Sequence, residues 1–224
     1  MQLCGLLAAD CLDAKMKLSL VKHPDGLHRC SWCGDIPEYI HYHDTEWGMP
    51  VANDQRLFEK IILEGFQSGL SWITILRKRE AFRKAFAGFD IDKVARFTQT
   101  DVERLVLDAG IVRHRGKIVS AINNAKRARE LIDSRGSLAK FIWGFKPDKQ
   151  SRPAKITPDV AMTLTQTSES LALSKELKRL GFSFVGPTTM YAFMQSMGVV
   201  NDHLEGCVGR AKVEEALRVF RLPN

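Results

Sequence analysis

The chain has 224 residues and a formal net charge of +7, with 45% hydrophobic and 26% charged residues. This composition is typical of a globular protein with one domain or two very small ones, and it excludes a mainly disordered chain. The longest apolar runs, such as 61–63 and 72–76, are far shorter than the roughly 20 residues of a membrane-spanning helix. The excess of basic residues is compatible with a polyanionic partner, with nucleic acid as the first candidate, although many basic proteins bind no polyanion.

The cysteine pattern and the N-terminal residues indicate in which cellular compartment the protein is expected. There are five cysteines, an odd number without the regular framework of a secreted domain, which indicates reduced thiols or metal ligands in a cytoplasmic chain. The apolar residues near Leu6 follow no basic residue and are interrupted by Asp10 and Asp13, so export is not expected. We interpret residues 1–28 as a flexible extension that precedes the domain.

Helical periodicity begins near residue 30, and strand-like alternation is nearly absent, so we predict an all-α domain. Asn53 or Asp54 is suited to cap a helix with an apolar face at positions 57, 58, 61, 62 and 65. Thr100 and Glu103 form a capping-box pattern before a helix at about 101–108. Further helices are expected at about 169–180, 187–197 and 212–220, after a proline-containing loop at 146–158.

The turn at 109–113 contains Gly110 and leads into another long helical pattern, so a helical hairpin is predicted here. Between positions 113 and 129 the chain has six basic residues and no acidic one: Arg113, Arg115, Lys117, Lys126, Arg127 and Arg129. The first three lie where the second helix begins, and there the free N–H groups and the helix dipole favour a phosphate. The alternative is a solvated helix face, which is what most basic runs are.

Two pairs of residues suggest a metal site: Cys30 with His43, and His203 with Cys207. Two thiolates and two imidazoles suit a closed, tetrahedral zinc site of the structural kind, which would tie the beginning of the domain to its end. Cys33 forms a C-x-x-C with Cys30 and is an alternative ligand. The other interpretation is that these cysteines are ordinary core residues and the histidines ordinary surface residues.

Aromatic residues gather in a short stretch that holds Trp32, Tyr39, Tyr42 and Trp47, and Trp72 follows soon after. Such a cluster is either a local core or a set of ring faces that hold an unstacked base. Glu64 continues the apolar face of its helix, where an unpaired carboxylate is costly, so it needs a donor or a cation. A carboxylate beside aromatic faces suits a positively charged heterocycle, whereas a surface or helix-end glutamate is the plainer interpretation.

Several motifs together resemble the type I, constitutive 3-methyladenine DNA glycosylases of bacteria. The matching segments are YHDTEWG at 42–48, LEG at 63–65, GLSWIT at 69–74, DAGIVRHRGKI at 108–118, GFSFVG at 181–186 and NDH at 201–203. The likeness covers about residues 29–207 in order. It implies a helix-hairpin-helix glycosylase fold, in which two helical subdomains flank the DNA cleft and a structural zinc joins the chain ends. Residues 208–224 are then a C-terminal helical extension.

The resemblance also implies roles for individual residues. The zinc ligands fall on Cys30, His43, His203 and Cys207, with Cys33 as a bystander. The base pocket falls on Trp32, Tyr39, Tyr42, Glu64 and Trp72, with Glu64 and Tyr42 hydrogen-bonding the base as the catalytic pair. DNA contacts are expected at Gly110, Arg113 and Lys117, with Leu70 as the wedge into the duplex.

The implied reaction is hydrolysis of the N-glycosidic bond of 3-methyladenine in double-stranded alkylated DNA, which releases the free base and leaves an abasic site. Relatives of this fold often carry a catalytic acid after the hairpin, whereas Asn123, Asn124 and Lys126 occupy that region here. With no evident lysine for a Schiff base, we predict a monofunctional hydrolase. A monomer is expected because it suits an enzyme that scans DNA. Phe66 stands where the family pattern has a glutamine, which leaves the lesion range open. The alternatives are a non-catalytic, zinc-stabilised DNA-binding module and a zinc-stapled helical interaction protein.

Overall fold

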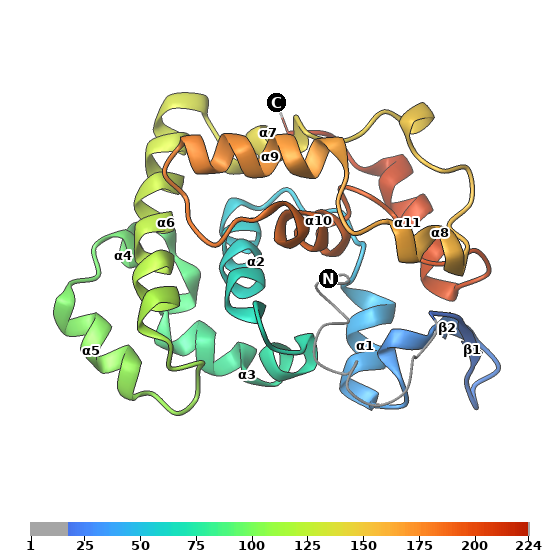
Figure 1. Cartoon of the computed structure of the whole chain (residues 1–224), viewed down its shortest axis with the longest axis horizontal. Helices are drawn as coiled ribbons and strands as arrows, with labels where there is room; N and C mark the ends of the chain where they lie inside the picture. The colour runs from blue at the N-terminus through green and yellow to red at the C-terminus, as the bar shows by residue number, and fades with distance from the viewer. Residues whose placement is uncertain (1–17, 224) are drawn as a thin grey trace.

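The computed structural model describes residues 18–223 and is mostly helical, which confirms the main part of the fold prediction (Figure 1). The α-helices are α1 (Pro37–Thr45), α2 (Asp54–Gln67), α3 (Trp72–Ala85), α4 (Ile91–Ala95), α5 (Gln99–Leu107), α6 (Arg115–Arg135), α7 (Leu138–Trp143), α8 (Pro158–Thr163), α9 (Ser168–Arg179), α10 (Pro187–Ser196) and α11 (Val208–Val219). Single 3-10 turns are η1 (Ser31–Cys33), η2 (Ala87–Phe89) and η3 (Lys149–Ser151). No helix within the described range is both long and apolar enough to cross a membrane.

A short β-hairpin precedes the helices. Strand β1 (Leu20–Lys22) pairs antiparallel with β2 (His28–Cys30), with Leu20 opposite Cys30. The predicted boundary at residue 28 therefore falls inside the hairpin, and residues 18–28 form part of the folded domain. The preceding part of the predicted extension, with Cys4 and Cys11, lies outside the described residues.

Helix α2 lies in the middle of the molecule, in contact with α3, α6, α7 and α10 (Figure 1). Its N-terminus is capped as predicted, because the Asn53 side chain accepts a hydrogen bond of 2.9 Å from the backbone N–H of Arg56. Every residue from Leu57 to Gln67 is buried. A helix buried on all sides offers its polar side chains no water, so they must find partners inside the protein.

The predicted helical hairpin is formed by α5 and α6, which pack against each other. The capping prediction was two residues off: the Asp101 carboxylate accepts a 2.9 Å hydrogen bond from the backbone N–H of Thr98, so α5 begins at Gln99. Glu103 instead pairs with Arg115 across the hairpin, at 2.6 Å. A capping box needs its acid three residues after the cap, and both Thr-x-x-acid frames in this segment meet that rule.

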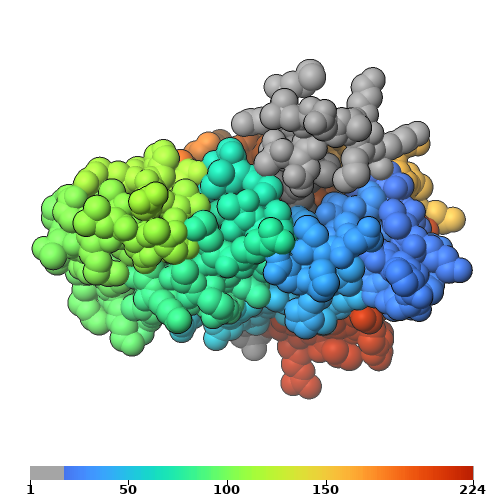
Figure 2. All heavy atoms as spheres, turned by 90° about the horizontal axis from the view of Figure 1, so that it is seen from below, coloured from blue at the N-terminus to red at the C-terminus, as the bar shows by residue number. Residues whose placement is uncertain are grey.

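The two ends of the described chain meet. Helix α11 packs against α1 and β2, Val213 of α11 is buried, and the Phe220 and Trp143 rings lie 4.4 Å apart. Seen from below, α5, α3 and α1 form one continuous face of the molecule (Figure 2).

Candidate active site and metal centre

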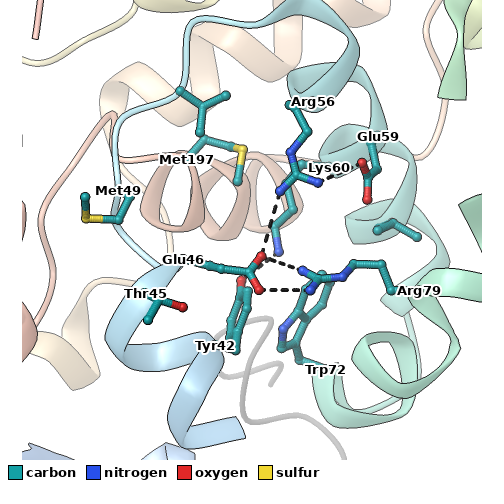
Figure 3. A pocket seen from close by; sticks show the side chains of 12 residues that line it. Tyr42, Thr45, Glu46, Met49, Arg56, Glu59, Lys60, Trp72, Arg79 and Met197 are labelled. Carbon is teal, nitrogen blue, oxygen red and sulfur yellow. Dashed lines mark hydrogen bonds and ion pairs between the residues drawn. The ribbon is translucent and has the colours of Figure 1, made fainter. Parts of the chain in front are cut away.

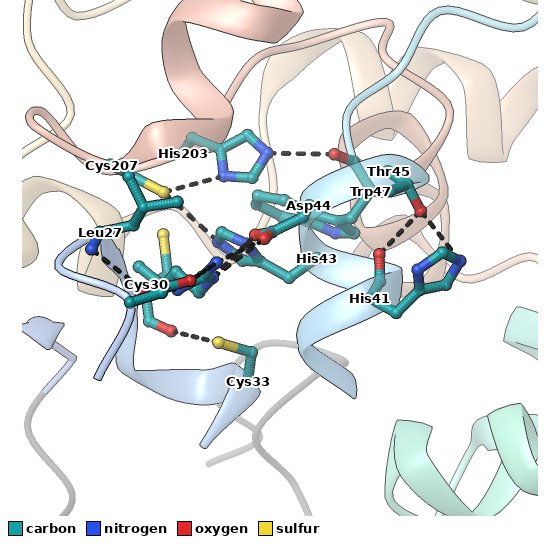
Figure 4. Close-up of polar contacts among 12 residues, drawn as sticks. Leu27, Cys30, Cys33, His41, His43, Asp44, Thr45, Trp47, His203 and Cys207 are labelled. Atoms are coloured by element: carbon teal, nitrogen blue, oxygen red, sulfur yellow. Dashed lines mark hydrogen bonds and ion pairs between the residues drawn. The ribbon is translucent and has the colours of Figure 1, made fainter. Parts of the chain in front are cut away.

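The four predicted metal ligands come together at this junction of the chain ends. One ligand atom from each of Cys30, His43, His203 and Cys207 lies within 4.8 Å of the others, and all four residues are buried (Figure 4). The Cys207 Sγ is 3.4 Å from both the His43 Nε2 and the His203 Nδ1. Zinc–sulfur and zinc–nitrogen bonds at a tetrahedral angle place S and N about 3.5 Å apart. The donor set and its spacing therefore fit a tetrahedral metal ion.

Each imidazole is oriented through its second ring nitrogen. The His43 Nδ1 is 2.7 Å from the Asp44 carboxylate, and the His203 Nε2 is 3.0 Å from the Trp47 carbonyl oxygen. Arg29 donates to both Asp44 oxygens and so holds this carboxylate in place. Carboxylate or carbonyl partners of this kind fix the ring orientation of metal-bound histidines.

Two neighbouring residues show how closely the centre is packed. Cys33 is not part of the ligand group, because its Sγ donates to the Cys30 carbonyl oxygen at 3.2 Å. This geometry agrees with its predicted place as a bystander. A Cβ atom at Gly209 would lie 2.2 Å from the His203 ring, so only glycine fits there.

The aromatic slot, by which we mean Trp32, Tyr39, Tyr42, Trp72 and the acid Glu64, is assembled beside the metal centre. Helix α1 begins with Pro37 and buries Tyr39, Tyr42 and His43, whose i, i+3, i+4 spacing puts them on one face. The Trp32 ring lies 5.1 Å from both the Tyr39 and the His43 rings. One helix face thus serves the slot and the metal centre together.

The Glu64 carboxylate is buried, as predicted, and its partner is a lysine that the sequence analysis did not assign. Lys60 Nζ is 3.0 Å from the Glu64 carboxylate and donates a 2.9 Å hydrogen bond to the Tyr42 hydroxyl. It also lies 3.2 Å from the centroid of the Trp72 ring. The i, i+4 spacing of the two residues on α2 is the signal that could have revealed the pair.

Burial governs the titration of this pair. It raises the pKa of Glu64, and the nearby ammonium opposes this rise. Burial lowers the pKa of Lys60 to about 8, although Glu64 acts in the other direction. Burial also raises the pKa of the Tyr42 hydroxyl well above its ordinary value. The pKa of Lys60 therefore lies closer to neutral pH than that of an exposed lysine.

A cavity of about 150 Å³ opens next to this cluster, and Tyr42, Lys60 and Trp72 line part of it. At this cavity the Glu46 carboxylate pairs with both guanidinium N–H groups of Arg79, at 2.6 and 2.9 Å (Figure 3). Because these opposite charges neutralise each other, the pair adds no net charge to the slot.

Two of the side chains with unsatisfied polar atoms lie on either side of the turn between α2 and α3. Among the described residues, both amide atoms of Gln67 and the indole N–H of Trp72 are buried without a hydrogen-bond partner, as is the indole N–H of Trp47. Gln67 is three residues after Glu64 and on the same side of the helix. An unpaired buried amide weakens the fold unless a ligand or water satisfies it, and no pattern in the sequence indicated this.

The predicted DNA-contact residues differ in placement. Arg113 is exposed, just before α6. Lys117 is buried and donates to the carbonyl oxygens of Phe66 and Ser68, at 2.9 and 2.6 Å. The structure therefore gives Lys117 the place of an anchor that ties the end of α2 to α6, where a free phosphate-binding cation was predicted. Leu70 is half-buried in the turn that follows α2, and Gly110 is half-buried in the turn between α5 and α6.

Two remaining sequence features have structural explanations. Asn124, in the region where relatives of the fold carry an acid, donates to the Ser183 carbonyl and accepts from its N–H, both at 2.9 Å. Phe66 is buried against Phe82, with ring centroids 4.7 Å apart. Its aromatic character is thus accounted for by core packing.

An aromatic slot with a buried acid, set on a helical fold with a basic, exposed hairpin, is typical of proteins that hold an unstacked nucleobase. Comparison with known proteins identifies the family within this class. The family model described as methyladenine glycosylase matches residues 32–210. The chain belongs to this family, as the motifs predicted.

The matches to individual relatives extend over nearly the whole length of those proteins. The DNA-3-methyladenine glycosylase of Haemophilus influenzae is 48% identical over 179 residues, which is 80% of this chain and 96% of that protein. DNA-3-methyladenine glycosylase 1 of Escherichia coli is 49% identical over 181 residues, 81% of this chain and 96% of that protein. A solved structure of a 3-methyladenine DNA glycosylase I variant in complex with 3-methyladenine is 34% identical, with a TM-score of 0.72, and the match covers 81% of this chain and 97% of that one.

Proposed function

We propose that this chain is a DNA repair enzyme that excises 3-methyladenine from alkylated DNA by hydrolysing its N-glycosidic bond. The observation that carries the proposal is the buried Glu64 carboxylate, which is joined through the Lys60 ammonium to the Tyr42 hydroxyl and the Trp72 ring face. Membership of the methyladenine glycosylase family and the names of relatives at 48% and 49% identity support it.

The chemistry of the lesion matches such a slot. Methylation at N3 makes the base cationic while it is attached to the sugar, so the bond is already weak and the base departs neutral. An anionic side chain and aromatic faces bind a flat cation better than a neutral base. In our proposal Glu64 and Tyr42 hydrogen-bond the base edge, Trp72 stacks on its face, and Trp32 and Tyr39 close the slot.

We propose that α5 and α6 act as a helix-hairpin-helix element that grips double-stranded DNA. Support comes from the exposed Arg113 at the start of α6, where free N–H groups favour a phosphate. Lys117 holds the turn that carries Leu70, the proposed wedge. Phe184, exposed and in the left-handed backbone region at φ 56°, lies against Gly65 and adds an aromatic face. Strained residues of this kind persist where function uses them.

We propose that the metal is zinc and that its role is structural. Cys30, His43, His203 and Cys207 would hold it with no open position for substrate, so it supplies no chemistry to the reaction beyond fixing the fold. Because His43 follows Tyr42 on α1, the metal centre would also fix the wall of the aromatic slot.

We propose a monofunctional enzyme without a lyase step. The Lys60 amine is the lysine nitrogen nearest the slot in the described part of the chain, and it lies over the Trp72 face, where the base would stack. An amine at the base face is poorly placed to attack the sugar carbon. Borohydride added during the reaction should therefore trap no covalent complex of protein and DNA, and a trapped complex would contradict this assignment.

The direct test is to incubate the zinc-containing protein with methylated double-stranded DNA and to identify the released bases by chromatography. We expect free 3-methyladenine and an abasic site. DNA binding without base release would instead show a non-catalytic DNA-binding module, and metal binding without DNA affinity a zinc-stapled interaction protein. We further propose a cytoplasmic monomer, and sedimentation of the free protein tests its oligomeric state.

A further inference from the structure

The Lys60 ammonium makes the contacts that the proposed mechanism assigns to the substrate. It pairs with Glu64 at 3.0 Å, donates to the Tyr42 hydroxyl at 2.9 Å and lies 3.2 Å from the centre of the Trp72 ring. Only 5% of its surface is exposed. A carboxylate, a hydroxyl and an aromatic face are thus already occupied by a cation that belongs to the protein itself.

A base and this ammonium cannot share the slot. A base stacked on Trp72 would lie about 3.5 Å from that ring, and the Lys60 Nζ already lies there, 3.2 Å from the ring centroid. The other charged groups that line the cavity beside Lys60 are paired with one another. Glu46 pairs with Arg79 and Arg56, and Glu59 pairs with Arg56 and Arg83. Ser196 on α10 is uncharged, and Tyr42 on α1 is neutral because burial raises its pKa. Among the described residues, Lys60 is therefore the cation that pairs with Glu64.

We propose that Lys60 determines specificity: its ammonium is the resident counter-ion of Glu64, and a cationic base takes its place only as Lys60 releases a proton to solvent. The inference rests on the proposed function. The balance is simple: the ammonium becomes a neutral amine, its proton goes to water, and the base supplies the positive charge that Glu64 requires. The net charge of the slot is the same before and after binding.

This exchange discriminates between bases. A normal, neutral adenine that displaced the ammonium would leave Glu64 buried without a cation, whereas a 3-methylated, cationic base compensates the carboxylate fully. After the glycosidic bond breaks, the base is neutral and no longer balances Glu64. Lys60 then takes up a proton again and competes with the product for the same contacts. The lowered pKa of Lys60, about 8, puts proton release within reach at neutral pH.

The test follows the Lys60 proton directly in the full-length, zinc-containing protein. Lysine labelled with carbon-13 at Cε reports its protonation by NMR, and the signal missing from Lys60→Met, or from Lys60→Arg if the first variant does not fold, identifies Lys60. The probes are the 3,9-dimethyladeninium cation and neutral 3-methyladenine. We expect Lys60 to titrate near pH 8 in the free protein and to be neutral at pH 7 with the cation bound. It should keep its proton when the neutral base is added, because a neutral base does not displace the ammonium from Glu64. A protonated Lys60 beside the bound cation overturns the inference.

Kinetics give a second readout. In the wild-type enzyme, kcat/KM for 3-methyladenine release should rise about tenfold per pH unit below the Lys60 pKa and level off above it, and Lys60→Met should lack this break. If no base is released at any pH, the proposed function fails. If base is released but the variant keeps the wild-type pH profile, only the role of Lys60 fails.

Discussion

Replacing Glu64 by glutamine is the most informative single perturbation, because it keeps the shape of the slot and removes its negative charge. Glu64 is 5% exposed and its charged partner is Lys60, at 3.0 Å. Hydrogen bonds to charged groups contribute about 1.5–3 kcal/mol. The carboxylate should bind the positively charged transition state more tightly than a glutamine amide does by this amount. The value of kcat/KM should therefore fall about 10- to 150-fold in Glu64→Gln.

The same substitution has a bounded effect on stability. The pKa of Lys60 is lowered from 10.5 to about 8, which corresponds to a cost of about 3 kcal/mol at about 1.4 kcal/mol per pKa unit. Without Glu64 this pKa falls further, but at pH 7 the lysine turns neutral once its pKa is below 7. The added cost from the lysine is therefore about 1.4 kcal/mol at most, and the variant should stay folded.

The sign of the pH dependence provides a check. Because the folded pKa of Lys60 is below its unfolded value, the unfolded chain binds more protons between about pH 8 and 10.5, and stability rises with pH across that window. In Glu64→Gln this rise should begin at a lower pH, as denaturant unfolding at several pH values would show.

The assay for Glu64→Gln is single-turnover release of 3-methyladenine from methylated DNA, with unfolding measured on the same samples. Glu59→Gln is the matched control, since Glu59 is equally buried on α2 and pairs with Arg83 at 2.9 Å. We expect this control to lose stability and to keep its excision rate. Excision by Glu64→Gln within twofold of the wild-type rate would refute the reasoning.

Three further predictions concern other parts of the molecule. Elemental analysis should find one zinc per chain in the wild type and in Cys33→Ser but none in Cys207→Ser. Of these two cysteines, only Cys207 belongs to the ligand group. Equal loss of zinc in both variants would contradict the assignment. Gln67→Met should raise the free energy of unfolding by about 1–3 kcal/mol, because it removes a buried amide without partners, and a destabilised variant would show that the amide is satisfied in solution. Arg113→Ala should weaken DNA binding at all sequences and lower the slope of log K against log salt by about one, whereas an unchanged slope argues against a phosphate contact.

Local pattern was sufficient for most of the helices. Asn53 has the side chain of an N-cap, and an apolar run follows it, so α2 was predicted with its correct start. The β-hairpin at Leu20–Lys22 and His28–Cys30 was not predicted, because strands of three residues are too short to show alternation. The start of α5 was missed by two residues, because Thr98 and Thr100 both precede an acid at the capping distance and only the folded chain shows which one is used.

The sequence by itself determined the family, and it named the four residues of the candidate metal centre and the aromatic residues that gather beside it, because these depend on residue types in a fixed order. Tertiary structure decided the rest, since burial and charge pairing exist only once distant segments meet. Lys117 is basic in the sequence and a buried anchor in the fold. The overall charge of +7 likewise gives no indication that one of the cations, Lys60, lies inside the slot against Glu64. Desolvation by the packed helices turns that ordinary surface-type residue into a group with a pKa of about 8.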